Sequence, residues 1–169
     1  TREYLDPVRY ISNESSGKQG YEVALALNKL GVKTKLIAGP SDFLLKKGLN
    51  IKNITSAKEM MEEVKKSLPV DIAVCAAAVS DFRPTNKNKN KIKKNKINLD
   101  TIDLEKNDDI LSYLSKANKN RPKIVVGFSA ETQNVINNSK LKIKEKYCDL
   151  IIANDVSKKD TGFNSDYNK

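Results

Sequence analysis

The chain has 169 residues, a net charge of +10 and no histidine. The length suffices for one α/β domain with a buried core. The lack of histidine excludes Ser-His-Asp and Cys-His catalysis and removes the commonest zinc ligand. Cys75 and Cys148 lie far apart in apolar segments, which predicts buried free thiols in a reducing compartment. No apolar run is long enough to cross a bilayer. We therefore expect a cytoplasmic protein with no membrane partner, whose chemistry depends on positioning and charge.

The first half of the chain alternates amphipathic helices with short apolar strands. Apolar residues recur at helical spacing between Tyr21 and Leu30. Ser56 and Glu59 form a capping box, which predicts the start of a second helix that ends before Pro69. The elements predicted here are a helix at 18–30, strands at 35–38 and 51–54, and a helix that begins after Ser56.

The second half continues this alternation around a polar insertion of Lys and Asn at 86–98. Asn107 or Asp108 is predicted to cap a helix that continues to Lys116. The other predicted elements are strands at 71–78, 124–128 and 150–153 and a helix at 133–146. The pattern predicts a three-layer, Rossmann-like α/β fold, with a mostly parallel sheet and helices on both faces. We expect a single domain over residues 1–169 that is cut at both ends.

Residues 9–20 combine an arginine, an asparagine, serines and glycines just ahead of the first helix. A helix start presents unpaired N–H groups and the positive end of the peptide dipoles, so it favours an anion. Ser16 and Gly17 would let a phosphate approach this backbone closely. An ordinary N-cap at Ser15 or Ser16 explains the same serines. Arg9 and Asn13 favour a binding site.

Ligands of parallel α/β sheets bind beyond the carboxyl ends of the strands. This rule singles out the segments at 77–84, 128–132 and 154–157 together with the opening loop. After the central strand, small alanines leave room for a ligand, and Asp81 offers a carboxylate to a hydroxyl, an amide or a metal ion. The alternative is that Asp81 only caps a turn.

The insertion is explained equally well by a solvated low-complexity loop. Ile92, however, interrupts the polar run beside Lys91, as expected where a mobile loop docks on another surface. A lysine delivered by such a loop could neutralise a triphosphate. We therefore keep Lys91 as a candidate site residue.

Short motifs stand in a fixed order along the chain. They are Thr1-Arg2-Glu3, Asp6-Pro7-Val8-Arg9, Ile11-Ser12-Asn13, Ser15-Ser16-Gly17-Lys18, Ala76-Ala77-Ala78-Val79-Ser80-Asp81-Phe82-Arg83-Pro84, Lys91-Ile92-Lys93-Lys94, Val126-Gly127-Phe128-Ser129-Ala130-Glu131-Thr132, Ala153-Asn154-Asp155-Val156 and Gly162-Phe163-Asn164-Ser165-Asp166. Together they resemble the phosphopantothenoylcysteine synthetase (phosphopantothenate–cysteine ligase) domain of coenzyme A biosynthesis, over essentially the whole chain. That family usually has a strand ahead of Thr1 and further strands after Asn168.

The resemblance implies a two-step ligation. CTP activates the carboxylate of 4′-phosphopantothenate as an acyl-cytidylate, and the amine of cysteine then displaces CMP to form the amide. It also implies Mg²⁺ as cofactor, a homodimer, and fusion to a flavin-dependent decarboxylase domain outside this chain. No nucleic-acid partner is expected from the family.

The resemblance also assigns roles to individual positions. Asn13 would handle the acyl-nucleotide intermediate, Lys91 would meet the triphosphate, and Arg9 would bind the substrate phosphate across a dimer interface. Asn13, Ala77, Ala78 and Asp81 would contact the pantothenate. The expected nucleotide site comprises Cys75, Ala76, Ala77, Asp81, Lys91, Asp108, Asp109, Ile110, Leu111, Phe128, Lys142 and Lys146.

Two other functions remain open from the residues alone. The charge of +10 suits a nucleic-acid-binding module, although aromatic residues make up only 6% of the chain. A nicotinamide-dependent oxidoreductase would suit the fold, but it would need a Gly-x-Gly-x-x-Gly motif, which is missing. Preferential binding of NADPH, or salt-sensitive binding of DNA or RNA, would distinguish these alternatives.

Overall fold

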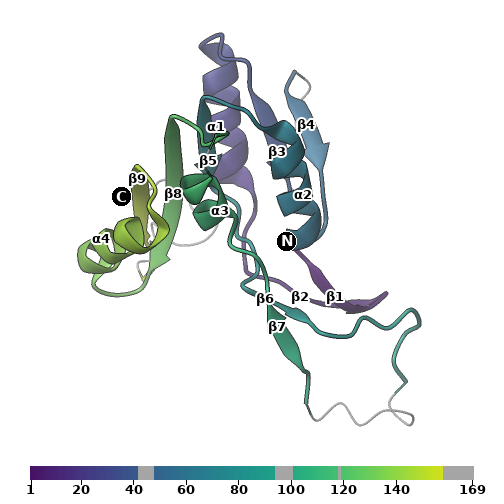
Figure 1. Ribbon diagram of the computed structural model, residues 1–169. Helices are drawn as coiled ribbons and strands as arrows, with labels where there is room; N and C mark the ends of the chain where they lie inside the picture. The colour runs from purple at the N-terminus through teal and green to yellow at the C-terminus, as the bar shows by residue number, and fades with distance from the viewer. Residues whose placement is uncertain (42–47, 94–100, 118, 158–169) are drawn as a thin grey trace.

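The structure is a computed structural model that describes residues 1–41, 48–93, 101–117 and 119–157. Its centre is a parallel sheet in the order β5-β8-β9, formed by Ile72–Cys75, Ile124–Glu131 and Leu150–Asp155 (Figure 1). A second parallel pair joins β3 (Lys35–Ala38) to β4 (Asn50–Asn53). Within the described ranges, no hydrogen-bonded ladder joins β3 to β5.

Helices cover both faces of the parallel strands, so the expected α/β class is confirmed. Helix α1 packs against β3 on one face, and the other helices lie on the opposite face (Figure 1). Helix α3 packs against β5 and β8, and α4 packs against β8 and β9. The bounds are Lys18–Lys29 for α1, Ala57–Ser67 for α2, Ile110–Lys116 for α3 and Val135–Lys146 for α4.

The helix caps confirm one prediction, correct a second and decide an alternative that the sequence left open. Ser56 caps α2 by accepting from the N–H of Glu59 at 3.2 Å, as predicted. Helix α3 is capped by Asp109, not by Asn107 or Asp108, because the Asp109 carboxylate accepts from the N–H of Ser112 at 2.7 Å. The alternative of a Ser15 or Ser16 cap for α1 is excluded, since its N-cap is Gly17, with a left-handed φ of 74°.

Two antiparallel strand pairs form an arm that projects from one end of the sheet (Figure 1). Glu3–Asp6 (β1) pairs with Arg9–Ile11 (β2), and Phe82–Pro84 (β6) pairs with Leu104–Lys106 (β7). The sequence predicted none of these strands, because three or four residues are too few to show an alternating pattern. The arm is an additional structural unit of the fold.

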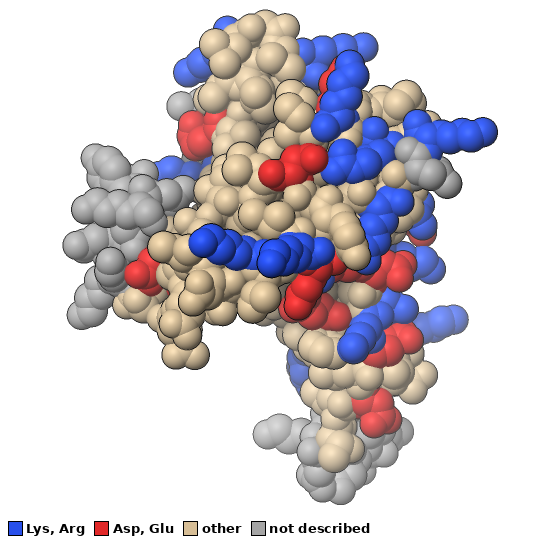
Figure 2. Space-filling view, turned by 60° about the vertical axis from the view of Figure 1, so that its left-hand side comes forward, with Lys and Arg blue, Asp and Glu red and all other residues tan. Residues whose placement is uncertain are grey.

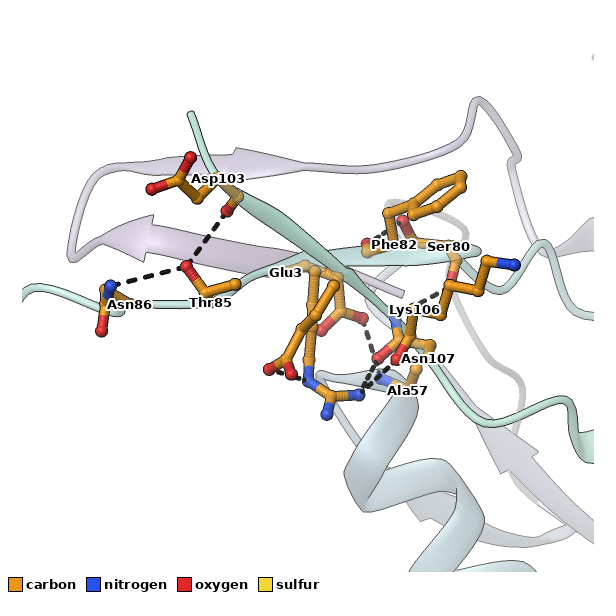
Figure 3. Close-up of polar contacts among 11 residues, drawn as sticks. Glu3, Ala57, Ser80, Phe82, Thr85, Asn86, Asp103, Lys106 and Asn107 are labelled. Carbon is orange, nitrogen blue, oxygen red and sulfur yellow. Dashed lines mark hydrogen bonds and ion pairs between the residues drawn. The ribbon is translucent and has the colours of Figure 1, made fainter. Parts of the chain in front are cut away.

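A buried carboxylate attaches the arm to the body of the molecule (Figure 3). The side chain of Glu3, on β1, accepts from the N–H of Ala57 at 2.9 Å, at the start of α2. Glu3 is only 4% exposed, so water screens this contact little. The first turn of α2 therefore fixes where the arm leaves the sheet.

The main core lies between the parallel strands and the helices α2 and α3. Its buried members are Ile54, Met60, Met61, Ile110, Leu114, Val125 and Cys148.

Strand β8 is longer than predicted and continues to Glu131, so the segment expected as a loop from Phe128 on begins within a strand. No helix among the described residues is long and apolar enough to span a membrane. The motif at 162–166 and the residues 94–98 of the insertion lie outside the described residues.

Candidate active site

A cavity of about 920 Å³ lies between α1, the strands β3 and β5, and the start of α3. The segments after β3 and β5 and those just ahead of α1 and α3 reach it, as expected for ligand sites of parallel sheets, and residues within α1, α2 and α4 complete its lining. The predicted site residues that line it are Asn13, Gly17, Cys75, Ala76, Ala77, Ala78, Asp81, Asp108, Asp109, Ile110, Leu111, Phe128, Lys142 and Lys146. The fold therefore brings most of the predicted site to one cavity.

The side chain of Asn13 is oriented by the segment after β5. Its Nδ2 donates to the main-chain oxygen of Val79 at 3.1 Å. A primary amide carries two N–H donors, so this bond leaves one donor for a ligand. The bond also ties the loop before α1 to Ala77 and Ala78, which lie in the same cavity wall.

The turn before α1 depends on Gly17. Its φ of 74° lies in the left-handed region, and a Cβ there would come within 3.3 Å of Ser41 Oγ. The hydroxyls of Ser15 and Ser16 accept from the N–H groups of Gly17 and Lys18, both at 3.3 Å. Neither serine caps α1, so the beginning of this helix borders the cavity without a side-chain cap.

Helix α4 supplies two of the basic side chains that line the cavity. Lys142 and Lys146 lie on one face of the helix because they are four residues apart. Lys142 Nζ donates to the main-chain oxygen of Phe128 at 3.2 Å, and Lys146 Nζ pairs with Asp109 Oδ2 at 2.5 Å. The hydrogen bond to Asp109 raises the pKa of Lys146, so that side chain carries its charge at neutral pH.

Asp109 has a double role at this wall. Burial opposes its ionisation, but hydrogen bonds from Lys146 and from the N–H of Ser112 keep the pKa of its carboxyl below the ordinary value. It therefore caps α3 while holding Lys146 toward the cavity. The pKa of the Cys75 thiol is raised to about 12 by burial and by the Asp109 charge, so Cys75 is a wall residue and not a nucleophile.

Arg9, Ser16 and Lys91 are the predicted site residues that do not line the cavity. Arg9 lies on strand β2 of the arm, and its NH2 donates to the main-chain oxygen of Ile92, next to Lys91, at 3.0 Å. Arg9 and the Lys91 segment therefore belong to the arm. The structure separates the predicted residues into a cavity group and an arm group.

Ser12 and Asn107 also line the cavity, although neither was predicted as a site residue. Asn107 Nδ2 donates to the main-chain oxygen of Ser80 at 2.8 Å, and its Oδ1 accepts from Arg83 at 2.8 Å (Figure 3). It thereby ties β7 to the segment that carries Asp81. Its position just before a predicted helix was visible in the sequence, but it was interpreted as a cap.

The carboxylates of the cavity suit a metal ion that arrives bound to a nucleotide better than a metal ion held by protein side chains alone. Among the described residues, no three Cys, Asp or Glu side chains are grouped as a metal site. Mg²⁺ bound to nucleotides usually takes one or two carboxylates and completes its shell with phosphates and water. Asp81 and Asp108 both line the cavity and provide carboxylates of this kind.

Comparison with known proteins identifies the family. The model for the DNA/pantothenate metabolism flavoprotein C-terminal domain matches residues 1–169. The chain belongs to this family. The coenzyme A biosynthesis bifunctional protein CoaBC of Haemophilus influenzae is 44% identical over 169 residues, and that of Vibrio vulnificus is 42% identical over 170. In each case the match covers 99% of this chain and 42% of the relative. The chain thus spans less than half the length of these curated relatives.

Solved structures agree with this assignment. A crystal structure of the C-terminal domain of the CoaBC protein superposes with a TM-score of 0.78 at 35% identity, covering 92% of this chain and 72% of that one. The DNA/pantothenate metabolism flavoprotein from Streptococcus pneumoniae superposes with a TM-score of 0.77 at 22% identity, covering 93% and 79%, and supports the fold. The family expected from the sequence motifs is confirmed.

Proposed function

We propose that this chain is a phosphopantothenate–cysteine ligase domain of coenzyme A biosynthesis that uses CTP. The observation that carries the proposal is the single cavity shared by Asn13, the segment after β5, the start of α3 and the lysines of α4. The names of the relatives support a role in coenzyme A biosynthesis. The ligase reaction and the choice of CTP rest on the motif resemblance.

The proposed reaction has two balanced steps. A carboxylate oxygen of 4′-phosphopantothenate attacks the α-phosphorus of CTP, and the bond to pyrophosphate breaks. The nitrogen of cysteine then attacks the acyl carbon, CMP leaves with its bonding electrons, and the amine loses one proton. The first step brings two anions together, so cations are the main requirement. Lys142 and Lys146 supply fixed positive charge at the cavity wall.

Asn13 suits the second step. Its Nδ2 is already positioned by Val79, and its remaining N–H can donate to the carbonyl oxygen of the acyl-cytidylate. Such a donor stabilises the negative charge that develops on that oxygen as the amine attacks. Mg²⁺, held by Asp81 or Asp108 together with phosphate oxygens, would supply charge neutralisation at the nucleotide. A chain without histidine can perform this chemistry.

The proposal includes a homodimer formed through the arm. Arg9 and Lys91 carry charge suited to phosphates, yet neither lines the cavity of its own chain. The arm and its surroundings expose apolar side chains, with Val8 56%, Phe82 45% and Leu104 46% exposed. A second copy packed on this surface would cover them and bring Arg9 to the partner's cavity.

The positive charge supports a small polyanionic substrate. Figure 2 shows Lys and Arg side chains over the visible face, with Asp and Glu side chains among them. Two of the cavity lysines are fixed by named partners, Phe128 and Asp109, which suits a defined ligand. Loose, salt-sensitive binding to a polymer needs no such fixed geometry.

Pyrophosphate release tests the proposal. The intact chain with 4′-phosphopantothenate, CTP and Mg²⁺ is expected to release pyrophosphate, and ATP in place of CTP is expected to release less. Omission of phosphopantothenate is the control for simple nucleotide hydrolysis. No release by folded protein would contradict the proposal. Preferential binding of NADPH, or tight binding of DNA or RNA, would point to one of the alternative functions.

A further inference from the structure

The carboxylate of Asp6 is a buried anchor that the cavity and its chemistry do not explain. Asp6 is 0% exposed and ends strand β1 of the arm. Its Oδ1 accepts from the N–H groups of Val8 and Arg9 at 2.9 and 3.0 Å, and these bonds fix the hairpin turn. Its Oδ2 accepts from the N–H of Ile92 at 3.1 Å, from a segment more than eighty residues away in sequence.

Ile92 is held at its side chain and at both main-chain groups. Its side chain is only 5% exposed, although lysine and asparagine surround it in sequence. Its N–H donates to Asp6, and its carbonyl oxygen accepts from Arg9 NH2 at 3.0 Å. Arg9 NH1 lies 3.5 Å from Asp6 Oδ2, so one ion pair binds both the N–H and the carbonyl oxygen of Ile92.

Two further contacts align the same segment along β1. The N–H of Asn88 donates to the main-chain oxygen of Leu5 at 2.8 Å. The ammonium group of Lys87 lies 5.4 Å from the centre of the Tyr4 ring, which is a cation–π distance. The segment 87–92 therefore follows the arm and is anchored most firmly at Ile92.

We propose that Asp6 is a positioning residue for Lys91. The planar peptide unit that carries the Ile92 N–H also contains the Cα of Lys91. Fixing this peptide unit therefore fixes the point from which the Lys91 side chain extends. Lys91 and Lys93 are both exposed on either side of the buried Ile92, so the anchor presents their ammonium groups to solvent from a defined point. This role rests on the proposed function in one respect, namely that Lys91 meets the triphosphate.

Asp6→Asn tests the anchor selectively. An asparagine keeps one oxygen, which can still accept from Val8 and Arg9, but its amide nitrogen would face the N–H of Ile92 and the Arg9 guanidinium. We expect the amide exchange of Ile92, measured by NMR, to accelerate at least about tenfold, as for a lost hydrogen bond to a charged group. The amide of Val8 should change less, and protection of Val125 in β8 reports that the fold is intact.

A matched variant controls for the change of carboxylate to amide. Asp103 lies on the same arm, and its main-chain oxygen accepts from the N–H of Thr85 at 3.0 Å and from the Thr85 hydroxyl at 3.3 Å (Figure 3). Asp103→Asn should therefore leave the exchange of Ile92 unchanged. Should Asp6→Asn fail to fold, Ile92→Ala removes the apolar anchor instead and should accelerate exchange at position 92. Unchanged exchange in a folded Asp6→Asn or Ile92→Ala protein overturns the inference, whatever the enzyme activity.

Kinetics separate positioning from general stability. If Asp6 acts through Lys91, Asp6→Asn should slow CTP-dependent pyrophosphate release about tenfold alone but less than about twofold in a Lys91→Ala background. Equal slowing in both backgrounds would contradict the positioning role. Absence of pyrophosphate release from the unmodified chain would overturn the proposed function alone, because the exchange measurement needs no nucleotide.

Discussion

Asn13 illustrates how a single residue can be found from sequence and then understood from structure. Its place before a helix, beside serines and glycines, predicted a binding role. The structure adds that Val79 orients its amide from the strand end that also carries Ala77 and Ala78. The proposed role, donation to the acyl carbonyl, follows from that orientation.

Asn13→Asp should separate the two steps of the reaction. A carboxylate cannot donate a hydrogen bond and would repel a developing oxyanion, whereas it leaves the activation of the substrate by CTP largely intact. We expect amide formation to fall about 10²–10³-fold, the usual cost of losing such a donor. Quench-flow measurement of pyrophosphate and of amide product checks this. Equal loss of both products would refute the assigned role.

Some of the site residues predicted from the sequence lie where ligand sites of α/β sheets are expected. Asp81 follows strand β5 and Asp109 caps a helix, so the rule for ligand sites in α/β sheets locates them, whereas Phe128 lies inside β8. Arg9 and Lys91 were candidates from the local sequence, and the resemblance gave them roles, but no local pattern shows that they belong to the arm and not to the cavity. That separation depends on the pairing of Asp6 with a segment distant in sequence.

At the scale of elements, close packing of α3 on the sheet positions the cavity wall that carries Asp109. Gly127 lies in the middle of β8, and a Cβ there would come within 2.7 Å of both Ile151 Cδ1 and Leu111 Cδ2. The missing side chain thus allows α3 to approach β8. The Asp109–Lys146 pair then fixes α3 against α4. The cavity wall depends on both contacts.

Gly127→Ala should destabilise the fold through this packing. The two side-chain ends would have to move aside, and overpacking of this kind costs about 1–3 kcal/mol. Gly20→Ala is the matched control, because a Cβ there would meet Ala76 at an ordinary 3.7 Å. Since Gly20 lies inside α1, its replacement should stabilise by about 0.5–1 kcal/mol. Urea unfolding measures both; equal effects of the same sign would contradict the packing argument.

The longer elements were predictable because each repeats a pattern several times. Helix α2 combines a capping box with helical spacing of apolar residues, and its predicted start is confirmed. The strands of the arm contain three or four residues each, and β6 and β7 pair across the whole insertion, so the local sequence does not show their pairing. Asp109 was missed as a cap because Asn107 and Asp108 offer the same chemistry two residues and one residue earlier.

At the scale of the whole molecule, the division into a cavity and an arm predicts a composite site. A mixture of Arg9→Ala and Asn13→Asp proteins should form heterodimers in which one site carries neither substitution. With random assortment, amide formation should recover to about a quarter of the unmodified level. Light scattering establishes the dimer, and each variant alone is the control. No recovery from a dimeric mixture would place Arg9 and Asn13 in the same chain's site.

Stability should be insensitive to pH near neutrality and fall in acid. The carboxyl groups of Asp6, Asp109 and Asp149 all have pKa values below the ordinary 3.8, because N–H groups and basic side chains bond to them. A lowered pKa contributes stability above the unfolded value, and that stability is lost as the pH falls below about 4.

The chain contains no histidine, so no imidazole titrates between pH 5 and 7. We expect the melting temperature to stay constant from pH 7 to 5 and to fall below pH 4, as measured by circular dichroism. Asp149→Asn should weaken the acid dependence, since Asp149 accepts from Val125 and pairs with Arg121. A midpoint of the stability change near pH 6 would contradict these assignments.

The proposed ligase reaction is tested most directly by its intermediate. The chain is incubated with 4′-phosphopantothenate, CTP and Mg²⁺ without cysteine, and the quenched mixture is examined by mass spectrometry. We predict an acyl-cytidylate of phosphopantothenate that disappears when cysteine is added, with one amide product and one CMP formed per intermediate consumed. Folded, nucleotide-binding protein that forms neither the acyl-cytidylate nor the amide would contradict the account.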